Sequence, residues 1–439
     1  MSLSSFFPHT EYVAAACLRP ATSNVTEPMS GTRLDTAGRR TRGGRLFRPI
    51  RFAGPWLGPR RLCGLFLLVS LWLWLAVSLP AKDIISFDRD GEVRTVEGRV
   101  EVEAQDGGLL VLARDGVLWA IQPQEIRSHK TDEAAFDPYQ PDDLAAAILA
   151  KLPAGFRVHQ TTHYVICYNT TREYAQWCGA LYERLYQAFY NYWNRRGMEL
   201  KESPPLVAVV FQDRASYEVY GRAELGSAIS AVIGYYSLET NRIAMYDLTG
   251  VDDLRNSRNR IPTAQHINQL LSQPQSERTV ATIIHEATHQ LAFNSGLQTR
   301  FADIPVWLSE GIAIYFETPD LRSKKGWSKI GEINGFRLQE FVRFMPQRPA
   351  DSLTTLLGSD ERFRDTAAAT PAYAESWALC YFLIRTRPKE FAEYLRLLRE
   401  KAPLVPCTAQ QRLADFRAAF GVDLGELNTD FIRHMHKLH

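Results

Sequence analysis

Alternating apolar and polar positions first appear in the chain after residue 82. From Gly91 to Ile126 the alternation is broken at Asp106-Gly107-Gly108 and again at Asp115-Gly116, which are hairpin-turn signals. This spacing favours short strands with one buried face. We therefore expect a small antiparallel β domain at 84–128 with a binding or spacer role, followed by a polar linker at 129–141.

A longer pattern starts at residue 142 and mixes helical and strand periods. Helical spacing predicts helices at 142–152 and 171–194, while 156–169 and 204–212 have the apolar content of strands. A hairpin is expected at 229–247, and the chain from Ser276 onward is mostly helical in pattern. The sequence thus predicts an α+β fold, with a mixed sheet and a helical C-terminal half in one domain at 142–439.

Residues 62–81 ("LCGLFLLVSLWLWLAVSLPA") contain no charge and have the length of a bilayer-spanning helix. Residues 1–61 carry ten arginines against three acidic residues, a net charge of +7, and are typical of a disordered leader. Because positive charge favours the cytoplasmic side, this pattern predicts a transmembrane anchor, or a signal peptide, with the rest extracytoplasmic.

Charge and cysteine content narrow the possible partners. The residues after 61 carry a net charge of −5 and show no basic stripe, so nucleic-acid binding is not expected. Disulfides among the four body cysteines fit an oxidising compartment, but three pairings are possible and the sequence does not choose. No CxxC spacing suggests a cysteine metal site. The four cysteines are Cys167, Cys178, Cys380 and Cys407.

The stretch "ATIIHEATHQLAFNSG" at 281–296 carries the clearest chemistry. Apolar residues follow a helical period here, and Gly296 is a stop signal. His285 and His289 are four residues apart, so both imidazoles project from one helix face and can bind one ion. Two imidazoles suit zinc, and the adjacent Glu286 can take a proton from a water that the metal activates.

A zinc site of this kind needs a third protein ligand. Glu310 stands in the otherwise apolar "DIPVWLSEGIAIYFE" at 303–317. Twenty residues separate it from His289, enough for a loop and a returning helix to bring it back. A buried acid needs a partner, which makes Glu310 the leading candidate. Asp303 is a competing acid that we place in the loop. Glu317 is better placed to support a ligand than to bind the metal itself.

HEATH, followed by WLSEG and IAIYFE, resembles the gluzincin zinc metallopeptidases of the thermolysin-like and membrane-aminopeptidase-like types. The resemblance covers about residues 280–385. It implies that His285, His289 and Glu310 bind zinc and that Glu286 is the general base. A looser similarity of layout extends to an uncharacterised bacterial group of predicted gluzincins.

The same resemblance implies a tyrosine that stabilises the oxyanion, and "PAYAESWALCYFLI" nominates Tyr373 for that role. Two family patterns are missing. The GxMEN element that holds a free N-terminus is absent before HEATH, so amino-terminal trimming is not expected. The metzincin pattern fails because Ala292 and Ser295 stand where glycine and histidine are required.

These observations predict an extracytoplasmic, zinc-dependent peptidase, of endopeptidase type, that acts on peptide or protein substrates. Glu286 would activate the attacking water, with Tyr373 at the oxyanion. The alternative is a non-catalytic, membrane-tethered binding module on the same scaffold.

Overall fold

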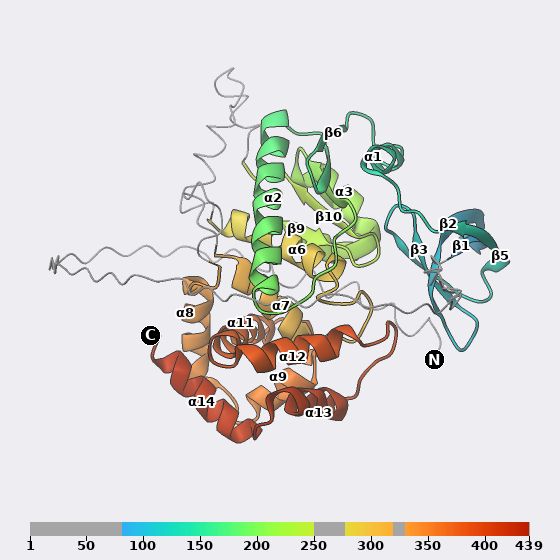
Figure 1. The fold of residues 1–439 in the computed structure, drawn as a ribbon. Helices are drawn as coiled ribbons and strands as arrows, with labels where there is room; N and C mark the ends of the chain where they lie inside the picture. The colour runs from blue at the N-terminus through green and yellow to red at the C-terminus, as the bar shows by residue number, and fades with distance from the viewer. Residues whose placement is uncertain (1–80, 250–276, 319–329, 439) are drawn as a thin grey trace, which may run out of the picture. The chain divides into compact units, whose positions relative to one another are not determined.

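The computed structural model of the protein describes residues 81–249, 277–318 and 330–438. These residues form two five-stranded sheets and a set of α-helices, and this α+β content agrees with the prediction (Figure 1). The leader predicted at 1–61 lies outside the described residues.

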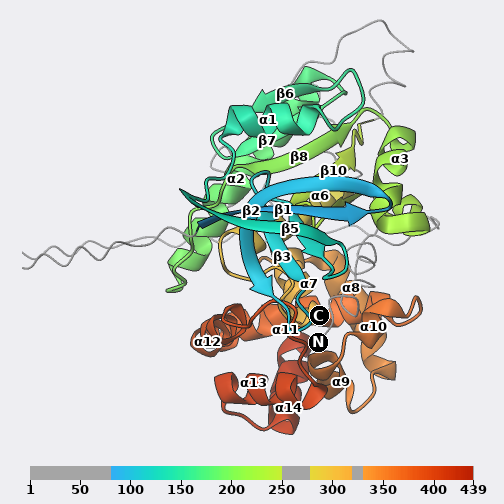
Figure 2. The same ribbon diagram turned by 90° about the vertical axis from the view of Figure 1, so that its right-hand side faces the viewer.

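The first sheet is wholly antiparallel and has the strand order β4-β3-β2-β1-β5 (Figure 2). Gly107 and Gly116 adopt positive φ angles of 86° and 84° at the two predicted turns, a backbone region that glycine enters without a steric penalty. The strands are β1 (Ala81–Arg89), β2 (Glu92–Glu103), β3 (Leu109–Ala113), β4 (Leu118–Ile121) and β5 (Ile126–Ala135).

Strand β5 differs from the prediction, because it occupies residues that the sequence assigns to a linker. It pairs with β1 from Ile126 to Ala135. Nearly every residue of β5 is exposed, so no apolar alternation marks it as a strand. Backbone pairing with β1, which cannot be read from side-chain pattern, creates this strand.

The second sheet is mixed and has the order β6-β7-β8-β10-β9. The three central strands β7, β8 and β10 are parallel, whereas β6 and β9 pair antiparallel at the two edges. The predicted hairpin at 229–247 therefore provides an edge strand. The strands are β6 (Arg157–Gln160), β7 (Tyr164–Tyr168), β8 (Leu206–Phe211), β9 (Gly234–Tyr236) and β10 (Arg242–Tyr246).

Helices cover both faces of this second sheet, which explains why β7 and β8 are buried along their whole length. Alternate side chains of β7 and β8 belong to two different hydrophobic cores. One core contains α1 (Pro141–Leu149) and α3 (Arg214–Leu225), and the other contains α2 (Arg172–Asn194) and α6 (Glu277–Asn294).

The C-terminal half of the described chain is helical and extends the core that contains α2 and α6. Helix α7 contacts α6 and also α11, so it links the sheet layer to the later helices. The helices are α7 (Val306–Phe316), α8 (Gly335–Phe344), α9 (Ser352–Gly358), α10 (Glu361–Arg364), α11 (Ala369–Thr386), α12 (Pro388–Arg399), α13 (Ala409–Phe420) and α14 (Leu424–His436), with short 3-10 turns at Gly226–Ala231 and Met345–Gln347.

The predicted membrane segment is not borne out. Within the described ranges, no helix is both long and apolar enough to cross a bilayer. Residues 62–80 lie outside those ranges, and Ala81 is the first residue of β1. The longest described helix, α2, has charged residues on the side opposite its buried face. The transmembrane anchor, the extracytoplasmic location and secretion after signal cleavage are therefore withdrawn.

The four body cysteines are all free thiols, so the expected disulfides are not formed in this structure. Cys167, Cys178 and Cys380 are buried, whereas Cys407 is partly exposed. The three buried cysteines act as small apolar side chains in the cores.

Candidate metal centre

Helix α6 is fixed to the second sheet by polar side chains in its last part, just after HEATH. Gln290 donates through Nε2 to the backbone oxygens of Val207 in β8 (3.0 Å) and of Asn241, just before β10 (2.9 Å). Asn294, at the end of the helix, forms hydrogen bonds with the Asn241 side chain. Because these groups are buried, the bonds hold α6 in a defined register on the sheet.

Helix α7 is positioned from the opposite side, by the C-terminal helices. Its first amide, Val306 N, donates to Asp360 Oδ1 at 3.1 Å and so is capped by a side chain from a distant part of the sequence. Gly311 faces α11, where an added Cβ would lie 2.4 Å from Cys380 Sγ and 2.7 Å from Ser376 O. The absence of a side chain at Gly311 permits the close helix contact that places Glu310.

Together, α6 and α7 bring His285, His289 and Glu310 into one buried cluster. One ligand atom from each lies within 4.8 Å of the others. The Nε2 atoms of His285 and His289 are 3.1 Å apart, and Glu310 lies 3.0 Å from His285 Nε2 and 3.4 Å from His289 Nε2. The structure thus assembles the three predicted ligands at one point.

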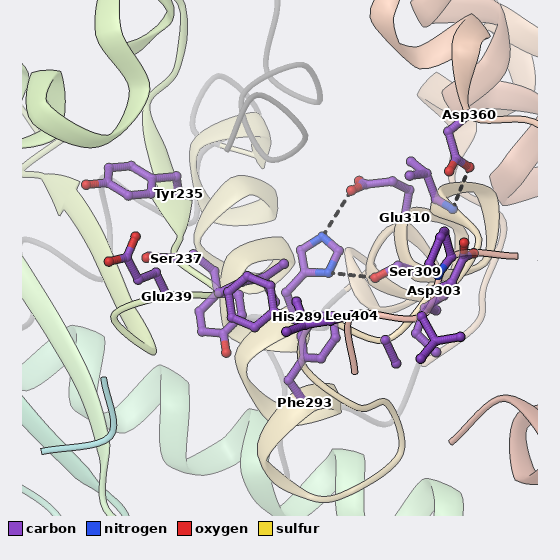
Figure 3. A pocket seen from close by; sticks show the side chains of 18 of the residues that line it. Tyr235, Ser237, Glu239, His289, Phe293, Asp303, Ser309, Glu310, Asp360 and Leu404 are labelled. Atoms are coloured by element: carbon purple, nitrogen blue, oxygen red, sulfur yellow. Dashed lines mark hydrogen bonds and ion pairs between the residues drawn. The ribbon is translucent and has the colours of Figure 1, made fainter. Parts of the chain in front are cut away.

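The outer nitrogen of each imidazole is held by another side chain. His285 Nδ1 lies 2.8 Å from Glu317 Oε1, and Asn334 Nδ2 donates to the second oxygen of Glu317 at 3.1 Å. Ser309 Oγ lies 3.3 Å from His289 Nδ1 and 3.1 Å from Gln298 Oε1. Figure 3 shows Ser309 and Glu310 reaching the two nitrogens of His289 from α7.

These contacts orient both Nε2 atoms toward Glu310, the arrangement in which histidine ligands are held at metal sites. Glu317 thus contacts His285, and its role in supporting a metal ligand stays a prediction. Sequence reasoning missed Ser309, Gln298 and Asn334, because they lie on different elements and share no spacing with HEATH.

Charge interactions shift the pKa values within the cluster. Burial alone would lower the pKa of His285, but its contacts with the Glu310 and Glu317 carboxylates raise it to about 10. Burial would raise the pKa of Glu310, but His289 and His285 lower it to about 2. The cluster therefore pairs the negative carboxylate of Glu310 with a cationic His285 imidazole. A metal ion could take the place of the extra proton on His285.

Glu286 is almost fully buried beside the cluster. Its Oε2 accepts a hydrogen bond from Tyr236 N at 2.8 Å. Ser237 N donates to Arg242 O, so the amide of the preceding Tyr236 points away from β10, toward the side of β9 where no other described strand lies. Oε1 is buried and accepts no hydrogen bond from any described residue. Burial raises the pKa of Glu286 to about 8, against the opposing charge of His285.

The donor set fits zinc. Two imidazoles and one carboxylate are the ligands of many catalytic zinc sites, which keep one further position open. Glu286 Oε1 adds a buried acceptor on the same helix as the two histidines, and a water molecule could use it.

The structure also places the other candidates from the sequence. Asp303 is bound to Arg412 Nε (2.8 Å) and to Cys407 N (2.7 Å), which gives this acid a structural role in place of metal binding. Tyr373 lies on α11, with its ring edge-on to Phe363 and under the Arg337 guanidinium. Its role at the oxyanion stays a prediction.

A cleft opens beside the cluster and is lined by His289, Ser309 and Glu310 (Figure 3). Its volume is about 230 Å³, and most of its exposed lining is apolar. The remaining lining comes from the end of α3, β9, the β9–β10 turn, the end of α6, the segments around Phe301 and Leu404, and the side chains of Asp360 and Arg412. The candidate metal centre is therefore at the wall of a cleft that could hold a side chain of a bound molecule.

Comparison with known families extends only to this part of the chain. Residues 279–405 match the model of a family described as "Protein of unknown function (DUF1570)", a span that contains the whole His285, His289 and Glu310 cluster. No curated protein matches the chain. The family match carries no activity with it.

Proposed function

We propose that this protein is a zinc-dependent hydrolase of peptide bonds. One observation carries the proposal: Glu286 lies buried beside the His285, His289 and Glu310 cluster, with Oε2 fixed by Tyr236 N and Oε1 available to a water. A buried base beside a metal-ligating cluster is the pairing that metal-assisted hydrolysis requires.

Zinc, when bound, would supply Lewis acidity toward a carbonyl oxygen and lower the pKa of water. Glu286 Oε1 would take the proton from the attacking water and later give it to the leaving amine nitrogen. Burial raises the pKa of Glu286 to about 8 in the metal-free site, and a cation bound to the cluster would lower it and so favour the carboxylate that accepts the proton.

Strand β9 is an edge strand among the described strands, and an extended peptide could lie along the side that faces away from β10. Because Tyr236 N binds Glu286, a peptide that pairs along β9 would lie next to the general base. Its side chains would alternate toward and away from the apolar cleft. This geometry favours a peptide over a small amide as the substrate.

The proposal is tested with the full chain, the His289→Ala variant and the Glu286→Gln variant. We measure zinc per chain after dialysis against metal-free buffer, and hydrolysis of fluorescently labelled casein. We expect about one zinc in the wild type and in Glu286→Gln, none in His289→Ala, and hydrolysis in the wild type alone. Chelation should stop hydrolysis, and zinc should restore it.

A folded wild-type chain that takes up no zinc would refute the metal centre. If the chain binds zinc but cleaves no casein and no labelled peptide library, hydrolysis is rejected. The non-catalytic binding module then becomes the better interpretation.

A further inference from the structure

The small β domain contains none of the three candidate metal ligands, yet it contacts the elements that form the cleft. Leu118 N at the start of β4 donates to Glu239 O, in the turn between β9 and β10, at 2.8 Å. Arg300 Nη1 donates to Gly116 O (3.0 Å) and to Leu238 O (3.2 Å), which joins the β3–β4 turn to the β9–β10 turn. Leu238 and Glu239 line the cleft.

A buried ion pair adds a second connection between the same two turns. Asp115, in the β3–β4 turn, lies 3.2 Å from Arg242 Nη2, at the start of β10, and both side chains are only 8% exposed. Lys151 also reaches Asp115, at 2.7 Å. Loss of either partner would leave an uncompensated buried charge, so the pair favours the arrangement in which the two side chains remain in contact.

The opposite wall of the cleft rests on the same domain. Phe301 and Leu404 both line the cleft, and both pack against the face of the small sheet formed by Leu110, Leu118 and Ala120. Leu404 N donates to Phe301 O at 2.8 Å, so the two segments are paired at this point.

Phe301 and Leu404 also have an unusual backbone. Their φ angles are 60° and 61°, in the left-handed region that bulky side chains rarely enter. Such a conformation costs free energy and persists where the surroundings over-determine it. Here the surroundings are the paired segment and the apolar face of β3 and β4.

From these contacts we infer that the small β domain is a positioning element of the cleft, with Arg300 and Asp115 as the residues that clamp the β9–β10 hairpin. The hairpin in turn holds Tyr236, whose amide binds Glu286 and whose hydroxyl binds Asn241. The significance of the clamp for substrate binding rests on the proposed function, whereas the clamp itself does not.

The test uses the full chain with Arg300→Gln, Arg300→Lys and Asp115→Asn. Arg127→Gln is the matched control, because Arg127 forms an ion pair with Asp88 (2.7 Å) within the small domain, away from the hairpin. Hydrogen exchange is followed by mass spectrometry in peptides that cover 232–247, with peptides that cover 206–211 as the internal reference. Casein hydrolysis is measured in parallel.

We expect Arg300→Gln to raise exchange in 232–247 on the order of tenfold, with 206–211 and zinc content unchanged. Arg300→Lys and Asp115→Asn should raise it less, and Arg127→Gln should not. In the casein assay KM should rise more than kcat falls. Wild-type exchange in the hairpin of all three folded variants would overturn the inference.

Hydrogen exchange tests the clamp and casein hydrolysis tests the proposed function, so the two can fail independently. If the wild type hydrolyses nothing, the exchange measurement still decides whether the clamp exists. If Arg300→Gln does not fold, Arg300→Lys and Asp115→Asn carry the same comparison, since each keeps a polar side chain at its position.

Discussion

Tyr236 N donates a hydrogen bond to Glu286 Oε2 across 2.8 Å, so the edge strand of the second sheet orients the carboxylate beside the metal-ligand cluster. The two residues are fifty positions apart in the sequence. The other oxygen, Oε1, is buried and accepts no hydrogen bond from the described residues. One backbone amide thus distinguishes the two oxygens of one carboxylate.

Glu286→Gln should keep the metal and lose hydrolysis. The amide has nearly the same shape as the carboxylate, and its oxygen can still accept from Tyr236 N, but it cannot take a proton. We expect kcat for casein to fall by about 10²- to 10⁴-fold with one zinc retained. The comparison is kcat and metal content in the same preparation, and undiminished turnover would reject Glu286 as the base.

Glu317→Gln should weaken metal binding by about 10- to 100-fold, because Glu317 orients His285 through Nδ1. Glu183→Gln is a matched control, since Glu183 makes the same contact with His163 Nδ1, at 2.7 Å, outside the cluster. Zinc affinity is measured by competition with a chelating dye. Equal affinities in both variants would show that Glu317 does not support the site.

Zinc binding should release at least one proton at pH 7.5. The pKa of His285 is raised to about 10 by Glu310 and Glu317, so the metal-free protein carries this proton at neutral pH and a metal must displace it. Competition from protons should therefore weaken zinc binding as the pH falls. This competition should diminish as the pH rises toward 10. The measurement is titration calorimetry in buffers of different ionisation enthalpy, where a binding heat independent of the buffer would contradict this.

Gly311→Ala should destabilise the fold by about 1–3 kcal/mol and reduce zinc content, because its Cβ would meet the α11 backbone at Ser376. Gly335→Ala is the control, since a Cβ at Gly335 meets nothing within 4 Å. Urea unfolding of both variants measures the difference. Equal stabilities would mean that α7 can move away from α11 without cost.

Iodoacetamide at pH 8 should modify Cys407 before the other three body cysteines. Burial raises the pKa of Cys167 to about 11 and that of Cys178 and Cys380 well above the ordinary range, and it also blocks access. Peptide mass spectrometry before and after unfolding in guanidinium reports each site. Rapid labelling of Cys178 in the folded protein would contradict the packing of α2.

The parts of the site that the sequence predicts are those fixed by local geometry. His285 and His289 share a helix face because of their spacing alone, and the structure brings Glu310 to them as expected. Tyr236, Asn334 and Gln298 could not be predicted in the same way. They meet the site through tertiary packing, and the first of them does so through a backbone amide that any residue would provide.

The fold shows the same division. The helix at HEATH, its end before Gly296 and the hairpin at 229–247 follow from periodicity and turn residues. Strand β5 was missed because its side chains are exposed on both faces. The membrane segment was inferred from apolar length, a criterion that no helix of the described residues meets.

The candidate ligands are held by two parts of the fold, the sheet that carries α6 and the C-terminal helices that carry α7. This arrangement affects the step of biosynthesis at which a metal can bind. His285 and His289 are fixed to the sheet through Gln290, whereas Glu310 is held by the packing of α7 on α11. A nascent chain that has emerged only as far as α7 contains all three ligands but lacks the helix that seats the third. Metal loading should therefore be a late event in biosynthesis, completed after Thr386 has left the ribosome.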